Sequence, residues 1–224
     1  MDLKQAITER HSVRQYTNQK LKKEPAAALR AEIDACNTEG GLHMQLVTDE
    51  PKAFSSFLAH YGKFNGVGNY IALAGRRSDS LDERLGYYGE RIALLAQTLG
   101  LNTCWVAATF GKSAVKKSCE IGQDEKLVCV LALGYGATQG VPHTSKPMKG
   151  LYKAARELPG WFQTGMETAL LAPTAMNQQK FLFTLLADHA VKAESTGGPY
   201  SKVDLGIVKL HFEIGAGKEN FRWA

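Results

Sequence analysis

The sequence predicts an α+β fold, in which helices and strands are mixed along the chain, and three observations lead to this prediction. Amphipathic segments with a helical period alternate with short apolar runs of the kind that form buried strands. A chain of 224 residues can bury a substantial core, enough for one large domain or two small ones. Part of the sequence pattern also recurs, so we expect the fold to be built from two diverged repeats.

The helical pattern is clear in several segments. We expect helices over residues 2–9, 24–36, 84–100 and 113–121, and the end of an apolar helix near Leu170. Pro25 falls in the first turn of its helix, where proline is favoured. Gly100 suits the C-cap of the long amphipathic helix before it, because glycine readily adopts the left-handed conformation found there.

Strands are expected from apolar and alternating runs between these helices. The candidates are residues 42–48, 69–75, 102–110, 126–136 and 180–188. The first of them follows a break at Gly40 and Gly41, and the run "KLVCVLALGYG" indicates a buried strand. The order of helices and strands is therefore mixed.

Two pairs of segments suggest an internal duplication. Residues 32–51 and 170–189 both read as helix end, loop and strand, and residues 87–105 and 202–223 both read as a helix followed by a strand start that ends in Trp. A duplication within one chain can form the kind of junction that a symmetric homodimer forms between two chains. The second half is therefore expected to be a shortened copy of the first.

The domain boundary is expected within the basic, Pro- and Gly-containing segment "VPHTSKPMKGLY". The first repeat would cover residues 1–150, and the second repeat, residues 151–224, would complete a binding site. The loops of the two copies differ, "NTEGG" in the first and "APTAMNQQ" in the second. Two equivalent sites per chain are therefore not expected.

Charge and cysteine usage restrict the class of protein. Lys plus Arg 27 against Asp plus Glu 22 gives a net charge of +5 that is spread along the chain, which suits an anionic small molecule at least as well as nucleic acid. Nucleic acid would call for a concentrated basic stripe, so no nucleic-acid partner is expected. The four cysteines form no CxxC pair and are expected to be reduced and buried: Cys36, Cys104, Cys119 and Cys129. With no signal-like opening and no apolar run of membrane-spanning length, we expect a soluble cytoplasmic protein that is not bound to membranes.

The segment "RHSVRQYT" places polar side chains at a period of two. In an extended segment Arg10, Ser12 and Arg14 would share one side, and two guanidinium groups with a hydroxyl suit a phosphate. The alternative is the solvated face of an edge strand, which the same spacing also produces.

The connection "LLAPTAMNQQ" carries several amide and hydroxyl groups within a few residues. A solvated loop explains them, because Pro, Thr and Asn are common in loops for backbone reasons. The alternative is a polar edge shaped for a ligand.

Four motifs together resemble the FMN-dependent nitroreductase family, and the similarity is greatest to its internally duplicated branch. They are "RHSVRQYT", "GLNTCWVAATF", "LALGYG" and "APTAMNQQKF". The resemblance covers nearly the whole chain and implies a nitroreductase-like fold, a mixed β-sheet flanked by helices. The resemblance implies that Arg10, Ser12 and Arg14 hold the FMN phosphate, with His11 contributing through its backbone.

The resemblance also assigns the second-repeat loop to the border of the isoalloxazine ring. The loop residues implied in the site are Pro173, Thr174, Ala175, Met176, Asn177 and Gln179. Asn177 and Gln179 would pair with the ring edge, since each amide offers a donor and an acceptor. Without the polar triplet of Arg10, Ser12 and Arg14, loop capping would be the preferred interpretation of Asn177.

A strand end is implied to run along the flavin, through Trp105, Val106, Ala107 and Ala108. Family members often carry glycine or an acidic residue here, so this chain departs from the pattern, and Trp105 suits the core as well as a ligand wall. Lys146 is implied to reach the phosphate, although Lys149 is an alternative and both suit a solvated linker.

The resemblance implies an FMN-dependent NAD(P)H oxidoreductase that reduces nitroaromatic, quinone or similar electron-poor small molecules. The alternatives are a flavin carrier or sensor without useful turnover, and a family flavoprotein with other chemistry such as dehalogenation. No catalytic residue is assigned, because the flavin performs the redox step. No histidine spacing suits a metal site, and the glycines of "GYGATQG" lack the strand and helix context of a dinucleotide fingerprint. A monomer or a homodimer is expected.

Overall fold

The computed structural model describes residues 1–55, 61–155 and 157–224. Its helices are α1 (Leu3–Glu9), α2 (Lys23–Gly40), α4 (Leu81–Thr98), α5 (Lys112–Ser118), α6 (Gly160–Ala169) and α7 (Ser201–Ala216). Short 3-10 turns occur at η1 (Lys52–Phe54), η2 (Met148–Gly150), η3 (Ala175–Asn177) and η4 (Lys218–Asn220). The strands are β1 (Gln45–Val47), β2 (Asn69–Arg76), β3 (Asn102–Val106), β4 (Glu125–Gly134), β5 (Tyr152–Ala154), β6 (Phe181–Leu185), β7 (Ala190–Ser195) and β8 (Arg222–Trp223).

The first sheet has the order β1-β2-β4-β3, and every neighbouring pair is antiparallel. Its two central strands are buried on both faces. In β2, Ile71 and Leu73 join one core cluster, while Tyr70 and Ala72 join another on the opposite face. This explains why the strand reads as a continuous apolar run, because both sets of alternating side chains are covered.

The second sheet has the order β5-β6-β7-β8 and is mixed. The outer pairs β5/β6 and β7/β8 are parallel, and β6/β7 is antiparallel. Phe181 and Phe183 of β6 are buried, and the ring of Phe183 stacks on Phe212 of α7 with centroids 4.7 Å apart. Aromatic packing of this kind attaches α7 to the second sheet.

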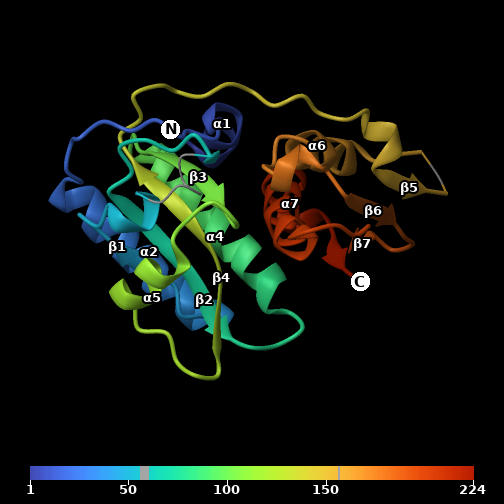
Figure 1. Ribbon diagram of the computed structural model, residues 1–224. Helices are drawn as coiled ribbons and strands as arrows, with labels where there is room; N and C mark the ends of the chain where they lie inside the picture. The colour runs from blue at the N-terminus through green and yellow to red at the C-terminus, as the bar shows by residue number, and fades with distance from the viewer. Residues whose placement is uncertain (56–60, 156) are drawn as a thin grey trace.

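The central helices α4 and α7 lie between the two sheets and pack against each other (Figure 1). Their closest approach is reciprocal: a Cβ at Gly86 would overlap the carbonyl oxygen of Val203, and a Cβ at Gly206 would overlap that of Glu83. The contact is symmetric: each glycine lies against the backbone of the residue that comes three positions before the glycine in the other helix. Only glycine permits backbones to approach so closely.

The connection from β4 to β5 crosses the molecule as the yellow strand-free segment along the top of Figure 1. It joins the part that holds the first sheet to the part that holds the second. Among the described residues, no helix is long and apolar enough to cross a membrane.

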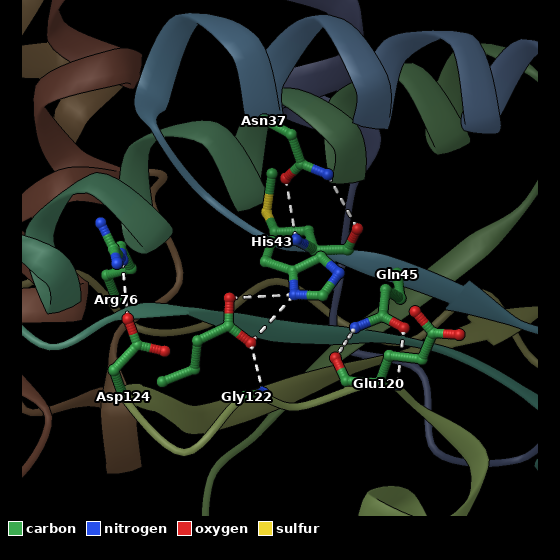
Figure 2. A network of polar contacts seen from close by, with 9 residues as sticks. Asn37, His43, Gln45, Arg76, Glu120, Gly122 and Asp124 are labelled. Atoms are coloured by element: carbon green, nitrogen blue, oxygen red, sulfur yellow. Dashed lines mark hydrogen bonds and ion pairs between the residues drawn. The ribbon is translucent and has the colours of Figure 1, made fainter.

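Polar contacts fasten the short edge strand β1 (Figure 2). Asn37 of α2 binds the backbone of Met44 twice, accepting from its N–H at 2.8 Å and donating to its carbonyl at 2.9 Å. His43 Nδ1 lies 2.9 Å from a carboxylate oxygen of Glu125, and the Gln45 amide bonds both to the carbonyl and to the N–H of Glu120. These contacts support a strand of only three residues.

The α+β prediction is confirmed, and most predicted elements are present with shifted ends. The strands divide between two sheets instead of forming one, because α4 and α7 occupy the space between them. The expected strand over 42–48 shortens to β1, and β5 and β7 were not predicted. β7 reads "AVKAES", whose charged residues gave no apolar run. All four cysteines are free, and three are buried, whereas Cys119 is half-buried.

Candidate functional site

A cavity of about 230 Å³ brings together three segments that are far apart in the sequence. The N-terminal segment contributes Ser12 and Arg14, the end of β3 and the following turn contribute residues 105–108, and the loop after α6 contributes residues 173–176. The start of α7 completes the wall. Most of the residues predicted for a binding site therefore lie around one cavity: Ser12, Arg14, Trp105, Val106, Ala107, Ala108, Pro173, Thr174, Ala175 and Met176.

The N-terminal segment runs beside β3. Ser12 pairs with Thr103 in a parallel bridge, and the N–H of Val13 donates to the Thr103 carbonyl at 3.1 Å. This pairing fixes the direction in which alternate side chains point. Arg14 is exposed, lies 5.9 Å above the ring of Phe64, and forms no ion pair with a carboxylate in the described chain.

The end of β3 provides a flat wall. Ala107 and Ala108 have small side chains, and the Ala107 carbonyl accepts a hydrogen bond from the Tyr200 hydroxyl at 3.3 Å. The sequence left two roles open for Trp105, in the core or in a ligand wall, and its side chain both packs against the core and lines the cavity. Its indole N–H donates to Glu90 Oε2 at 2.7 Å, which fixes the orientation of the ring.

The loop after α6 has a strained backbone. Met176, Asn177 and Gln179 all have positive φ angles, 53°, 52° and 44°. Non-glycine residues rarely adopt this conformation, and such strain persists only where surrounding contacts impose it.

Asp204 supplies part of that constraint. Its Oδ1 accepts from the N–H of Ala175 at 2.9 Å, and its Oδ2 accepts from the side-chain amide of Gln178 at 2.8 Å. The carboxylate lies on α7, is buried and lines the cavity. Burial raises the pKa of Asp204 to about 6, although the two hydrogen bonds oppose the rise.

Asn177 and Gln179 do not line the cavity, because their amides bind the linker. Both donate to the carbonyl of Thr144 at 2.9 Å, and Gln179 Oε1 accepts from the N–H of Lys146 at 2.7 Å. Lys146 Nζ in turn donates to the carbonyl of Gln178 at 2.6 Å. The assignment of these residues to a flavin stays a prediction, and their described contacts tie the linker to the loop.

Arg10 also lies apart from the cavity lining. It is only 3% exposed, and its Nε lies 3.3 Å from Glu90 Oε1. Neither Nε nor Nη1 has a hydrogen-bond partner among the described residues. The structure therefore brings Ser12 and Arg14 together but not Arg10, whose contact with a phosphate stays a prediction.

Glu90 is the centre of a buried polar group that we call the Glu90 cluster: Arg10, Glu90, Trp105 and His211. His211 Nε2 lies 2.9 Å from Glu90 Oε1, and its Nδ1 lies 3.2 Å from the carbonyl of Thr168. Burial alone would raise the pKa of Glu90, but Arg10, His211 and Trp105 together hold it below its ordinary value. Glu90 is therefore charged at neutral pH.

His11 is half-buried beside Arg10. Burial and the positive charge of Arg10 lower the pKa of His11. Because the imidazole is neutral at pH 7, it adds no charge to the N-terminal segment under physiological conditions.

Five residues that line the cavity were missed by the sequence predictions: Cys129, Tyr200, Val203, Asp204 and Ile207. Tyr200 and Asp204 are the two that carry an oxygen on the side chain. Asp204 gave a signal that could have been used, because it is a single carboxylate among apolar residues in "KVDLGIV". Tyr200 gave none: its position depends on a left-handed backbone, φ 58°, after Gly197 and Gly198.

Other hollows in the described parts of the chain are larger, but they do not bring the predicted segments together. Hollows of about 420 and 410 Å³ contain none of the predicted site residues, and Lys146 and Gln179 line a separate one of about 310 Å³. Within the described ranges, no group of three or more His, Cys, Asp or Glu residues could hold a metal ion.

A family model described as "Putative TM nitroreductase" matches residues 2–216. Because this match spans nearly the whole sequence, the chain belongs to that nitroreductase family. No curated protein matches the sequence.

Solved structures show the same fold. A "putative nitroreductase" from Thermotoga maritima has 22% identity and a TM-score of 0.66, covering 98% of this chain and 85% of its own. A "Putative NADH dehydrogenase/NAD(P)H nitroreductase" from Bacteroides thetaiotaomicron has 24% identity and a TM-score of 0.50, covering 66% and 95%. The NfrA1 nitroreductase from B. subtilis has 16% identity and a TM-score of 0.53, covering 67% and 73%.

Proposed function

We propose that the cavity binds FMN and that the protein is an FMN-dependent NAD(P)H oxidoreductase. Its second substrates would be nitroaromatics, quinones or similar electron-poor small molecules. The observation that carries the proposal is the convergence of three distant predicted segments on one cavity in a chain of the nitroreductase family.

The residues around the cavity fit the chemistry of this cofactor. Arg14 and Ser12 offer a guanidinium and a hydroxyl to a phosphate, and Arg14 has no carboxylate partner in the described chain that would compete. Ala107, Ala108 and Pro173 form a largely apolar wall for a flat ring. A cavity of about 230 Å³ suits a ring system, whereas a complete drug-sized ligand needs about 300–1,000 Å³, so the phosphate end would extend along the N-terminal segment.

FMN would supply the redox chemistry, accepting hydride from a nicotinamide and passing reducing equivalents to the acceptor. The protein would hold the ring and leave one side of it accessible. Met176 and Tyr200, which are 78% and 36% exposed, lie at the cavity and mark where the second substrate would enter.

The phosphate anchor can be tested with Arg14→Ala. We expect FMN affinity to fall tenfold or more, because charge-assisted contacts contribute about 1.5–3 kcal/mol, while riboflavin affinity changes little. Fluorescence titration measures both, and Arg30→Ala, which removes an exposed arginine of α2, serves as the matched control. Equal weakening of FMN and riboflavin would contradict the assignment.

Turnover distinguishes an enzyme from a flavin carrier. Anaerobic NADH or NADPH should bleach the bound flavin, and a quinone should restore its colour. If FMN binds but neither nicotinamide reduces it, the carrier alternative is favoured.

We also propose that residues 1–150 and 151–224 are diverged copies that build one site per chain. Among the α-helices and strands of the described residues, the order helix, strand, strand, helix, strand occurs as α2-β1-β2-α4-β3 and again as α6-β6-β7-α7-β8. The reciprocal contacts of Gly86 and Gly206 also support two related halves. Flavin titration against protein concentration should give one FMN per chain, and two would contradict this proposal.

A further inference from the structure

The loop that walls the cavity is held in a conformation that its own sequence disfavours. Three of the four residues 176–179 have positive φ angles, and none of the four is glycine. The cost of this conformation has to be offset by contacts from outside the loop. Those contacts therefore determine the shape of this wall of the cavity.

Asp204 makes two of these contacts from a different element. It accepts from the backbone of Ala175, which lines the cavity, and from the side chain of Gln178. The same Gln178 amide also donates to the carbonyl of Pro199 at 2.8 Å. The loop is therefore tied both to α7 and to the turn that carries Tyr200.

We propose that Asp204, in its ionised form, is a positioning residue that clamps the 173–178 loop into the shape required for flavin binding. The proposal rests on the proposed function, since the ligand is the flavin inferred above. It adds a residue outside the predicted set and a dependence on its charge.

Both oxygens of Asp204 act as acceptors, so the clamp is complete only when the carboxyl carries no proton. Burial raises the pKa of this carboxyl to about 6, which makes it charged at pH 7.5 and protonated at pH 5. A protonated oxygen loses its role as acceptor, and one of the two contacts is lost. The clamp therefore loosens as the pH falls through about 6.

The groups that face Asp204 do not change charge over this range. Cys129 of β4 stays a thiol, because burial raises its pKa, and Gln178 is an amide. Arg14 and the Tyr200 hydroxyl lie at the same cavity, and no ion pair of Asp204 with a cation occurs in the described parts of the chain. The pH dependence can thus be traced to Asp204 by comparison with a variant that lacks only its charge.

The experiment measures the affinity of riboflavin at pH 7.5 and pH 5. Riboflavin is chosen because the phosphate of FMN titrates near pH 6 and would obscure the effect. For the wild type we expect the dissociation constant to rise about tenfold from pH 7.5 to pH 5, the size of one lost contact to a charged group. Asp204→Asn should bind about tenfold more weakly at pH 7.5 and show a nearly flat pH profile, because Asn offers a donor where Gln178 also offers one.

Two further variants keep the result interpretable. Gln178→Leu removes the side-chain half of the clamp from the loop side and should weaken riboflavin while Asp204 remains. Asp34→Asn, the same change at an exposed position of α2, should leave the affinity and the pH profile unaltered. His11 is present in every variant. Any effect of its titration on riboflavin affinity would therefore remain in the pH profile of Asp204→Asn, where it can be told apart from the effect of Asp204.

Hydrogen exchange of the 173–179 segment tests the clamp without any flavin. After correction for intrinsic rates, exchange should be faster at pH 5 than at pH 7.5 in the wild type, and fast at both in Asp204→Asn. If no flavin binds the wild type while exchange follows this pattern, the proposed function fails and the clamp stands. If riboflavin binds, and affinity and exchange are the same in Asp204→Asn as in the wild type, the clamp is overturned.

Discussion

Two buried carboxylates on the central helices, Glu90 and Glu213, have partners of similar kinds: an indole, a cation and a side chain of the other central helix. Glu90 of α4 accepts from the indole of Trp105, which lies on the strand after its helix, and Glu213 of α7 accepts from the indole of Trp223, also on the following strand, at 2.7 Å. Each carboxylate also contacts the other central helix, Glu90 through His211 and Glu213 through Tyr87. We call the second set the Glu213 cluster: Tyr87, Glu213, Lys218 and Trp223.

The two clusters differ in where the cation lies. Arg10 is 3% exposed, whereas the Lys218 side chain is 68% exposed and its ammonium lies 2.8 Å from Glu213. When both members of an ion pair are buried, each charge depends on the other for stabilisation. When the cation is exposed, it can be solvated by water if its partner is removed. The same arrangement thus has different consequences in the two halves, and only the Glu90 cluster contacts a wall of the cavity, through Trp105.

The largest expected effect follows from removing the charge of Glu90. Glu90→Gln leaves Arg10 buried without its counter-charge, so the free energy of unfolding should fall by about 3–5 kcal/mol. The sign of the pH dependence follows from the lowered pKa of Glu90: its contribution is present at neutral pH and is lost as the pH falls through the acidic range. Urea denaturation at pH 7 and at pH 4 measures both.

Glu213→Gln is the matched comparison. Lys218 can return to solvent, so the loss should be smaller, about 1–3 kcal/mol from hydrogen bonds to a charged group. Equal losses in the two variants would show that exposure of the cation does not distinguish the clusters.

The sequence predicted the first half of the fold well, for a physical reason. β2 and β4 are buried on both faces and α4 is long and amphipathic, so local patterns alone identified them. The length of the edge strand β1 was overestimated because an apolar run does not show where pairing stops. The two residues before the strand, His43 and Met44, contact the side chains of Glu125 and Asn37.

The part of the candidate site that could be predicted is the part in which the local backbone alone determines where the side chains point. Ser12 and Arg14 were assigned by alternation along an extended segment, and the structure places both at the cavity. Arg10 follows the same alternation but is the C-cap of α1 and turns toward Glu90, a contact that depends on how α4 is placed. Asp204 was missed because its role arises only when α7 lies against the 173–178 loop.

The helix crossing provides a second test of the comparison, with an intermediate effect. Gly206→Ala would push a methyl group into the backbone of Glu83, and overpacking of this kind costs about 1–3 kcal/mol. Gly86→Ala should cost a similar amount, because its contact with Val203 is the reciprocal one. Gly160→Ala is the control, since a Cβ there meets no atom within 4 Å. Thermal melts of the three variants compare them directly, and a harmless Gly86→Ala beside a damaging Gly206→Ala would contradict a symmetric crossing.

The smallest expected effect concerns the exposed cation of the Glu213 cluster. Lys218→Met removes an ammonium that contacts Glu213 and the Tyr87 hydroxyl, both at 2.8 Å, yet exposed ion pairs contribute only about 0–1 kcal/mol. The loss of unfolding free energy should therefore stay below about 1 kcal/mol and should diminish further in high salt, because salt screens exposed charges. Urea denaturation at low and high ionic strength measures it. A loss of several kcal/mol that is insensitive to salt would mean that Glu213 depends on Lys218 as Glu90 depends on Arg10, and the difference between the two halves would then lie in the cavity alone.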